Sequence, residues 1–420
     1  MSTSLAYHTQ GIVGFQHHSF QYSEGEVIQR LKRKEFRCPK CFHCSVNAHH
    51  YRTRRIQGLP YGGMKVYFEV ELHRIYCPRC RALSVEELPF LSHPKTRITK
   101  ALERTILELR PEMTIHAISN YFHLDWRIVK ACEKRYLKRK FRRIKLKHVK
   151  IIGIDEIAIG HTAAGKTAYW TIVRDLDSGA VLHVDQGKDG DALRAFLLLL
   201  RRSKAEIEVV AMDMGKAFIH WVKEHLPSAQ IVFDHFHVIK LMNEKLDLVR
   251  RRIAAKLDAE ERAILKNQRF TLLRNEENLS SEATAYLSKI KQTFQELADV
   301  HMMKEALRSI YSVAQNVSQA EDALLRWVKA AQKIQSDQLH KMAKTILQHW
   351  DGILGFWRFG NMTNASMEGF NNKVRTMLRQ AYGYRDLEYM RLKIFNLPNN
   401  NITPCASFIG KKRKRACLGY

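Results

Sequence analysis

Two carboxylates in the middle of the chain stand in or beside apolar runs. Asp155 lies inside Lys150–Gly160, whose β-branched residues predict a buried strand. Burying a charge is costly unless the charge is paired or bound to a cation, so Asp155 is a candidate metal ligand. Asp213 ends a second apolar run, 207–212, and carboxylates at strand ends lie where open α/β sheets bind ligands. The two side chains can therefore converge if their strands are neighbours, whereas strand alternation points Glu156 to the opposite face.

A third carboxylate, Glu368, falls in a helix predicted near the end of the chain. It shares a polar stripe with Asn371, Asn372 and Arg375 at spacings of three, four and seven residues. A Glu in the first turn of a helix is usually favoured only by the helix dipole. The stripe therefore fits a site but does not by itself identify one.

Five of the eight cysteines fall between residues 38 and 80, and four of them form two Cys-Pro-basic-Cys turns. Cys38 and Cys41 belong to the first turn, and Cys77 and Cys80 belong to the second. Two such turns complete the tetrahedral shell of a Zn²⁺ ion, and four thiolates leave no open position, so a structural zinc is predicted. Cys44 is interpreted as a spare thiol, with ligand exchange as the alternative.

The charge of the chain predicts a nucleic-acid partner. Seventy Lys and Arg against 42 Asp and Glu give a net charge of +28. Helical periodicity over 96–141, with a short break at 123–125, fits a helix-turn-helix, and eleven Lys or Arg lie between 130 and 150 against the single acid Glu133. The side chains expected to contact DNA from this region are Arg127, Lys130, Lys134, Arg135, Arg139 and Arg142.

The elements that would position these residues change in character along the chain. Strand and helix patterns alternate over 146–237, which predicts an α/β domain. No glycine or proline occurs from Ser228 through Asp351, so this stretch is predicted to be helical, with capping boxes that begin at Asp258 and Ser318.

Neither a signal peptide nor a membrane span is predicted. The first ten residues lack a basic region followed by an apolar core, and the aliphatic run Ala195–Leu200 is far too short to cross a bilayer. The sequence therefore predicts a cytoplasmic, nucleoid-associated protein without membrane contact.

Taken together, the motifs resemble a known protein family. After the two Cys-Pro-x-Cys turns and the helix-turn-helix come Gly-Ile-Asp-Glu, Met-Asp-Met-Gly, Phe-Asp-His-Phe-His-Val and Asn-Ala-Ser-Met-Glu-Gly-Phe-Asn-Asn-Lys. This order resembles the DDE transposases of bacterial insertion sequences, specifically the ISL-three family, from about Cys38 to about Leu397.

The resemblance implies a catalytic site and its partners. Its RNase H-like core would carry the acidic triad Asp155, Asp213 and Glu368, which would hold two Mg²⁺ ions, with Mn²⁺ as a substitute. Asn372 and Arg375 would contact the scissile strand. The implied partners are double-stranded DNA, as terminal inverted repeats and as target, and a second copy of the chain in a dimer on DNA. Packing or a supporting role is the better interpretation of His235 and His237, which follow the last strand.

The expected fold is therefore α/β: an RNase H-like core with a large all-α insertion, preceded by a zinc ribbon and a helix-turn-helix domain. The boundaries are an N-terminal segment (1–37), the zinc ribbon (38–92), the helix-turn-helix domain (93–145), the first part of the core (146–237), the helical insertion (238–355), the Glu-bearing part of the core (356–398) and a basic tail (399–420).

Two other functions stay open at this point. An RNase H-like nuclease, such as a junction resolvase, would use the same triad to cut DNA without joining it. A zinc-ribbon and helix-turn-helix transcriptional regulator would explain the charge and the cysteines. It would leave the carboxylate in the apolar strand unexplained.

Overall fold

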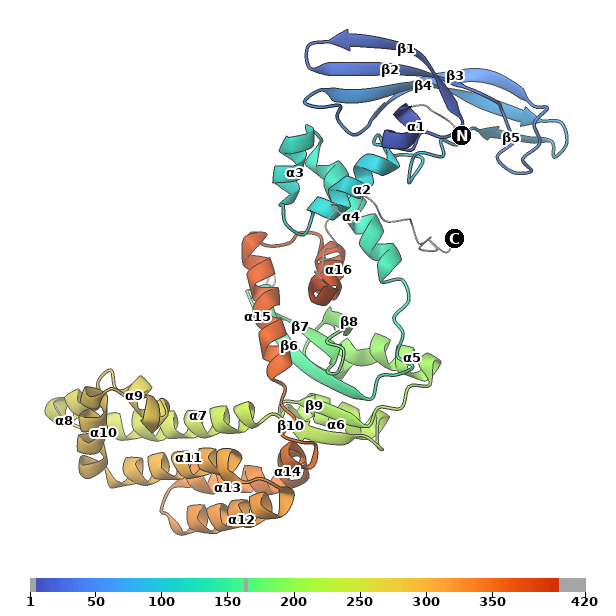
Figure 1. The fold of residues 1–420 in the computed structure, drawn as a ribbon. Helices are drawn as coiled ribbons and strands as arrows, with labels where there is room; N and C mark the ends of the chain where they lie inside the picture. The colour runs from blue at the N-terminus through green and yellow to red at the C-terminus, as the bar shows by residue number, and fades with distance from the viewer. Residues whose placement is uncertain (1–4, 162–164, 400–420) are drawn as a thin grey trace. The chain divides into compact units, whose positions relative to one another are not determined.

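The computed structural model describes residues 5–161 and 165–399, which fall into two compact units divided between Arg142 and Arg143 (Figure 1). Each unit contains its own five-stranded mixed sheet. The predicted basic tail lies outside the described residues from Asn400 onward.

The first unit contains a sheet in which β1 to β4 have the order β1-β2-β4-β3, and β5 pairs with the far end of β4. β2 and β4 are parallel, and the other pairs are antiparallel. Its elements are α1 (Leu5–Gln10), β1 (Phe15–Ser23), β2 (Glu26–Arg33), β3 (Asn47–Gln57), β4 (Lys65–Cys77) and β5 (Ala82–Val85). The sheet therefore begins before residue 38, because β1 and β2 belong to the segment 1–37, which was predicted to lie outside the zinc ribbon. The pattern of β2 is weak because the polar Gln29 takes a buried position between Val27 and Leu31.

Three helices complete the first unit: α2 (Lys100–Leu109), α3 (Ile115–Phe122) and α4 (Trp126–Lys140). The Thr114 side chain caps α3, and His123 ends that helix in the left-handed conformation. Asp125 then caps α4 by accepting a hydrogen bond from the Arg127 amide. The predicted helices and the short connection between them are thus present.

The sheet of the second unit has the strand order β10-β9-β6-β7-β8. β6, β9 and β10 are parallel, while β7 and β8 are antiparallel to their neighbours. The strands are β6 (Ile151–His161), β7 (Thr167–Asp175), β8 (Val181–Gln186), β9 (Val209–Met212) and β10 (Gln230–Phe233). β6 and β9 coincide closely with the two apolar runs of the sequence, Lys150–Gly160 and 207–212.

Helices pack on both faces of this sheet. Ile152 and Ile154 of β6 share an apolar core with Phe196 of α5 (Arg194–Ser203), which follows the short 3-10 turn Gly190–Leu193, and with Trp221 of α6 (Lys216–His225). On the other face, α15 (Ala365–Gln380) contacts β6 and α16 (Leu387–Asn396) contacts β8. The chain ends its described part in a second short 3-10 turn, Leu397–Asn399.

Beyond β10, the stretch without glycine or proline is helical, as predicted. It contains α7 (His235–Ala254), α8 (Ala259–Leu265), α9 (Arg269–Leu273), the 3-10 turn Glu276–Asn278, α10 (Ser281–Thr293), α11 (Gln295–Val313), α12 (Val317–Lys333), α13 (Asp337–Gln348) and, across its end, α14 (Trp350–Arg358). Asp258 caps α8 as predicted. The capping box at Ser318 was wrong, because the Asn316 side chain accepts from the Gln319 amide and α12 begins before Ser318.

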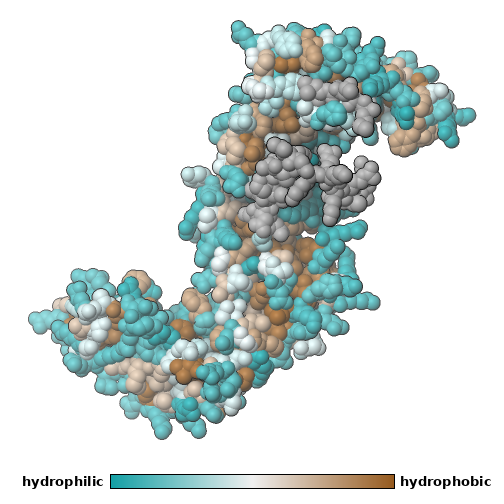
Figure 2. All heavy atoms as spheres, in the orientation of Figure 1, coloured by the Kyte–Doolittle hydropathy of each residue, from teal (hydrophilic) through white to brown (hydrophobic). Residues whose placement is uncertain are grey.

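Within the described ranges, no helix is both long and apolar enough to cross a membrane. On the face shown in Figure 2, hydrophilic residues predominate and hydrophobic ones are scattered among them. Such scattered apolar residues are ordinary for a protein surface.

A buried histidine in α11 makes the stability of the helical segment depend on pH. His301 is fully buried, neither ring nitrogen has a hydrogen-bond partner, and burial followed by the nearby Lys304 charge lowers its pKa to about 4. In the unfolded chain, His301 takes up a proton near the ordinary histidine pKa. The contribution of neutral His301 to the free energy of unfolding is therefore complete above that pKa and is lost as the pH falls toward the pKa of the folded state. Between pH 7 and pH 5 we expect a loss of about 2 kcal/mol from this residue.

His301→Leu should remove that loss, because leucine fills a similar volume and does not titrate. Urea unfolding of the wild type and the variant at both pH values measures the difference. His340→Leu is the matched control on exposed α13 surface. An equal pH dependence in the wild type and His301→Leu would contradict the prediction.

Candidate functional site

Asp155 and Asp213 lie on neighbouring parallel strands, Asp155 in the middle of β6 and Asp213 directly after the end of β9. β6 pairs with β9 in parallel from Ile151 opposite Val209 to Gly153 opposite Ala211. Continuing this register by two residues sets Asp213 beside Asp155, on the same side of the sheet. The sequence left open whether these strands are neighbours, and the structure answers that they are.

The negative charge of Asp213 acts on the carboxyl group of Asp155. Burial raises the pKa of Asp155, and the Asp213 charge raises it further, while the Glu156 amide, His237 and Asn371 favour the ionised form. Burial and then Asp213 also raise the pKa of Glu156. Asp213 therefore influences both adjacent acids of β6, although they leave the strand on opposite faces.

Helix α15 is held against the Asp155 face of β6. The Asn371 side-chain amide donates to Asp155 Oδ2 over 2.7 Å, and Asn371 is buried. Gly153, two residues before Asp155, lets the helix approach closely, since a Cβ there would lie 2.9 Å from Asn364 Oδ1 and 3.0 Å from Met367 Cγ. The start of α15 is therefore fitted to this strand at two successive positions on one face.

A buried arginine fixes the first turn of the same helix. Arg174 of β7 donates from Nη1 to the Ser366 carbonyl over 2.6 Å and from Nη2 to the Gly179 carbonyl over 2.8 Å. Its guanidinium also lies over the Phe370 ring, 4.4 Å from the ring centroid. Both contacts restrain the part of α15 that carries Glu368.

Glu368 lies in the first turn of α15, three residues before Asn371, and its side chain is exposed. Residues three apart on a helix are neighbours on its surface, so Glu368 is one helical step from the residue that touches Asp155. The apolar side chains of α15, Met367, Phe370, Val374 and Met377, are buried, and Met367 faces Gly153 of β6. The structure thus brings the Glu-bearing helix against the strand that carries Asp155.

The end of β10 adds polar groups beside this carboxylate cluster. Asp234 caps α7 and is buried; burial opposes its ionisation, but hydrogen bonds with His235 and the Phe236 amide lower its pKa. His237 interacts electrostatically with both Asp234 and Asp155. His235 packs between the rings of Tyr311 and Phe356, with centroids 5.5 and 5.1 Å away.

The donor set suits a hard divalent cation. Asp155 and Asp213 have no ion pair with Lys or Arg in the described ranges, and the buried Oδ1 atoms of Asn364 and Asn371 have no hydrogen-bond partner. Carboxylate and amide oxygens are the ligands that Mg²⁺ prefers. The acids do not form a group of three ligand atoms within 4.8 Å of one another. A pair of ions about 3.5–4 Å apart would be compatible with this spread, because its ligands are divided between two metal positions.

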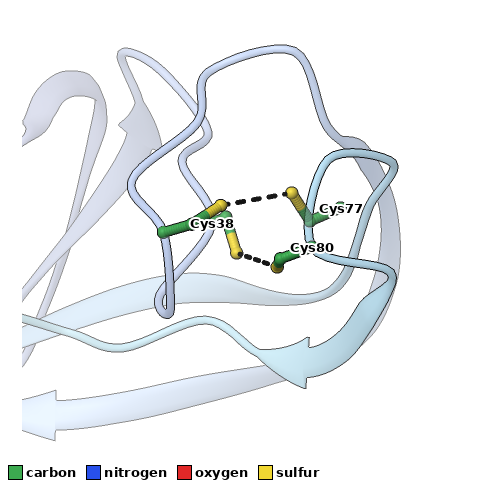
Figure 3. Close-up of side chains that lie close together, drawn as sticks. Cys38, Cys77 and Cys80 are labelled. Atoms are coloured by element: carbon green, nitrogen blue, oxygen red, sulfur yellow. Dashed lines mark hydrogen bonds between the residues drawn. The ribbon is translucent and has the colours of Figure 1, made fainter.

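A second candidate metal site lies in the first unit, where four thiols converge. The sulfurs of Cys38, Cys41, Cys77 and Cys80 all lie within 4.8 Å of one another, with 3.6 Å from Cys38 to Cys80 and 3.5 Å from Cys41 to Cys77 (Figure 3). A Zn–S bond of about 2.3 Å corresponds to a tetrahedral S···S edge of about 3.8 Å. The cluster is therefore compatible with a structural zinc ion.

The backbone around this cluster favours thiolate formation at one ligand. The Cys41 amide and other hydrogen bonds lower the pKa of Cys38 to about 6, whereas burial and the neighbouring thiols raise the pKa of Cys80 to about 12. Metal binding requires deprotonated thiols. Cys44 is exposed and lies outside the four-sulfur cluster.

Comparison with known proteins assigns the family. The ISL3 family model of DDE transposases, described as "Transposase", matches residues 152–394, which is more than half of the chain. The chain belongs to this transposase family. It is 30% identical over 361 residues to the transposase for insertion sequence element IS1001 of Bordetella parapertussis, covering 85% of this chain and 87% of that protein.

Other relatives agree. The transposase for insertion sequence element IS1557 of Mycobacterium tuberculosis, from strains CDC 1551 and H37Rv, is 28% identical over 387 residues, which is 86% of this chain and 85% of that protein. Among solved structures, the Drosophila P element transposase strand transfer complex matches with a TM-score of 0.40 and 14% identity, over 72% of this chain and 92% of that chain. The family match and the curated relatives identify the protein as a DDE transposase, and this family implies the use of divalent metal and of DNA as a partner.

The basic residues predicted to contact DNA lie in different environments in the transposase. Arg127, Arg139 and Arg142 are exposed, with Arg127 paired to Asp125, and Lys130 and Lys134 are half-buried. Arg135 turns inward and pairs with the buried Glu103 at 3.3 Å, so its guanidinium already has a partner inside the first unit.

The acid within this basic stretch is also removed from the surface. Glu133 is buried and pairs with Arg110 at 2.6 Å. The exposed part of the stretch is consequently more uniformly basic than its composition indicates. In α15, Asn372 and Arg375 are exposed, and Arg375 donates to Asn372 Oδ1 over 2.8 Å.

Sequence reasoning missed several residues that shape the transposase site. Asn371 was recognised as part of a polar stripe, but its contact with Asp155 joins residues 216 positions apart. The polar stripe of α15 was the only indication in the sequence that Asn371 belongs to the site. No comparable signal marked Arg174, whereas Asn364 is the first residue of the Asn-Ala-Ser-Met-Glu-Gly-Phe-Asn-Asn-Lys motif.

Proposed function

We propose that this transposase binds the ends of its insertion sequence, hydrolyses a phosphodiester there with divalent metal, and joins the freed 3′-hydroxyl to target DNA. The observation that carries the proposal is the hydrogen bond from Asn371 of α15 to Asp155, on the strand that neighbours β9 and its following residue Asp213. A strand carboxylate that is half-buried among other acids is stabilised when a cation binds it.

In this proposal Asp155, Asp213 and Glu368 form the catalytic triad. They would hold two Mg²⁺ ions, for which Mn²⁺ can substitute, and the bound ions would activate the attacking hydroxyl and neutralise phosphoryl charge. Asp155 would be the ligand common to both ions, since its strand neighbours the one that Asp213 follows and its carboxylate accepts a hydrogen bond from Asn371 of α15. Asn371 positions Asp155, and Arg174 positions the helix turn that carries Glu368.

We assign the second unit an RNase H-like core interrupted by a helical insertion. Support comes from the five-stranded mixed sheet, the acids at its strand ends and the helices on its two faces. The insertion would span 238–355, between the last strand and the Glu-bearing segment 356–398. Its proposed limits agree with the observation that α7 starts directly after Asp234 and that α14 returns to pack against β10.

End recognition is assigned to the first unit. A Zn²⁺ ion on the four-cysteine cluster would fix the two turns of the ribbon, and α4 would contact DNA with its basic side chains. Of the predicted contacts we retain Arg127, Lys130, Lys134, Arg139 and Arg142, and leave Arg135 with its internal partner. Asn372 and Arg375 would contact the scissile strand. The proposed active species is a dimer on DNA, acting in the nucleoid.

Supplying a pre-cut element end separates a transposase mechanism from cutting alone. We expect a duplex with the terminal repeat and a free 3′-hydroxyl to be joined to target plasmid in the presence of Mg²⁺. The measurement is the appearance of labelled end in the plasmid band. A matched end that terminates in a 2′,3′-dideoxynucleotide should give no product, because it lacks the nucleophile. Cleavage of intact ends without joining of the hydroxyl end would favour a resolvase.

A further inference from the structure

A cleft next to the carboxylate cluster has the features of a binding site for a nucleobase. It has a volume of about 820 Å³, within the range of roughly 300–1,000 Å³ that small-molecule sites occupy. Strands β6, β7 and β8 line one side, and the end of α15, the following loop and α16 line the other. All of these elements belong to the second unit and are seen around α15 and α16 in Figure 1.

The side chains that line the cleft suit a ligand that is both aromatic and negatively charged. Trp170, Tyr382 and Tyr384 contribute aromatic rings, while Arg375 and Arg379 contribute positive charge. Among the described residues that line the cleft there is no carboxylate. Bases stack on aromatic side chains and their phosphates pair with arginine, so the combination matches an unstacked nucleotide.

Tyr382 is the most unusual of these residues. It directly follows the last residue of α15 and its cap, at a left-handed φ of 50°, where glycine is the usual residue and a bulky side chain is strained. Its amide donates to the Arg379 carbonyl, and the Gly383 amide donates to the Leu378 carbonyl, so the turn is well formed. The ring is nevertheless 100% exposed. A large aromatic side chain that is held in a strained turn and covers nothing in the folded chain indicates a binding role.

The position of the cleft relates it to the proposed chemistry. Arg375 lies four residues after Asn371 on α15, which is about one helical turn, or about 6 Å, from the residue that touches Asp155. Ile159, also in the lining, lies four residues beyond Asp155 on β6. A DNA strand with one phosphate at the carboxylates would thus bring a neighbouring nucleotide to the cleft.

We propose that this cleft receives an unstacked nucleotide next to the scissile phosphate, with its base against Tyr382 and its phosphate near Arg375 and Arg379. The assignment rests on the proposed function, because it takes the carboxylate cluster as the place of strand cleavage. It adds a specific contact that would hold the end of the element open. Extruding a base requires least energy where the strand is already unpaired, so the contact should favour frayed or forked ends.

The test combines Tyr382→Ala with abasic DNA. The probe is a fluorescent terminal-repeat duplex whose last three base pairs are mismatched, bound by the full chain in EDTA and followed by anisotropy. We expect Tyr382→Ala to weaken binding roughly tenfold, as for loss of one base–aromatic stack. Removing the base at the one position that occupies the cleft should abolish this difference between the two proteins. Phe270→Ala, at another exposed aromatic residue in α9, is the matched control and should bind normally.

Two outcomes would overturn the proposal: equal binding of the forked end by Tyr382→Ala and the wild type, or the same difference for every abasic position within three nucleotides of the cut. Because binding in EDTA requires no catalysis, this result is independent of whether the protein cuts DNA. Absence of both cleavage and joining by the wild type with Mg²⁺ would instead contradict the proposed function.

Discussion

Asp155→Asn should abolish cleavage and joining while leaving DNA-end binding near the wild-type level. The substitution removes the charge of the proposed shared ligand but keeps an oxygen that can accept from Asn371. Metal stabilisation of a phosphoryl transition state contributes several kcal/mol, and about 4 kcal/mol corresponds to about a thousandfold in rate. We therefore expect at least a thousandfold loss, measured as cleaved labelled end per unit time with Mg²⁺.

The same variant should keep its fold and lose its response to metal. Burial and Asp213 both raise the pKa of Asp155, so removing its charge relieves repulsion and should not destabilise the metal-free protein. Ligands that bind the folded state raise its thermal midpoint, so Mn²⁺ should stabilise the wild type and stabilise Asp155→Asn much less.

Two further substitutions make this experiment decisive. Asp177→Asn, in the exposed turn between β7 and β8, is the matched control and should keep full activity. Glu156→Gln distinguishes the adjacent acids, since Asp213 raises the pKa of both. Loss of activity in Glu156→Gln together with an active Asp155→Asn would transfer the ligand role to Glu156.

Local patterns were sufficient to predict most of the second unit. The strands of this unit are apolar runs bounded by turn residues. Their limits follow from local residue preferences, which can be read from the sequence. In α15, Met367, Phe370, Val374 and Met377 recur with helical periodicity, and all four are buried.

Contacts between distant segments were beyond such patterns. The hydrogen bond from Asn371 to Asp155 depends on how α15 packs over Gly153, and no local preference specifies that packing. Arg135 illustrates the same limit, because a basic residue in a basic stretch has the same local signature whether it faces DNA or a buried acid such as Glu103. Burial of a charge is decided by the tertiary partner that compensates it.

Cys77→Ser should release the zinc of the first unit and weaken binding to the element end by more than about tenfold, as expected when a structural metal site is lost. Cys77 is fully buried at the end of β4, where it pairs with Ala82 of β5 and lies 3.5 Å from Cys41. Without the metal, the two cysteine turns lose the bonds that hold them together.

The sheet transmits this loss to the helices that are proposed to contact DNA. Buried Gln57, at the end of β3, donates from its side chain to the Phe122 carbonyl over 2.7 Å, and its carbonyl accepts from the Thr99 amide over 2.9 Å. Disorder in the sheet should therefore disturb α2 and α3, and with them the placement of α4. Zinc content by atomic absorption and end binding by gel shift measure the two steps separately.

Cys44→Ser is the matched control, because Cys44 is an exposed thiol outside the four-sulfur cluster. It should retain one zinc per chain and bind ends normally, whereas loss of zinc in this variant would favour ligand exchange at Cys44. A Cys77→Ser protein that lacks zinc but binds ends like the wild type would separate the ribbon from DNA recognition. Recognition would then have to come from α4 and its basic flank without support from the metal.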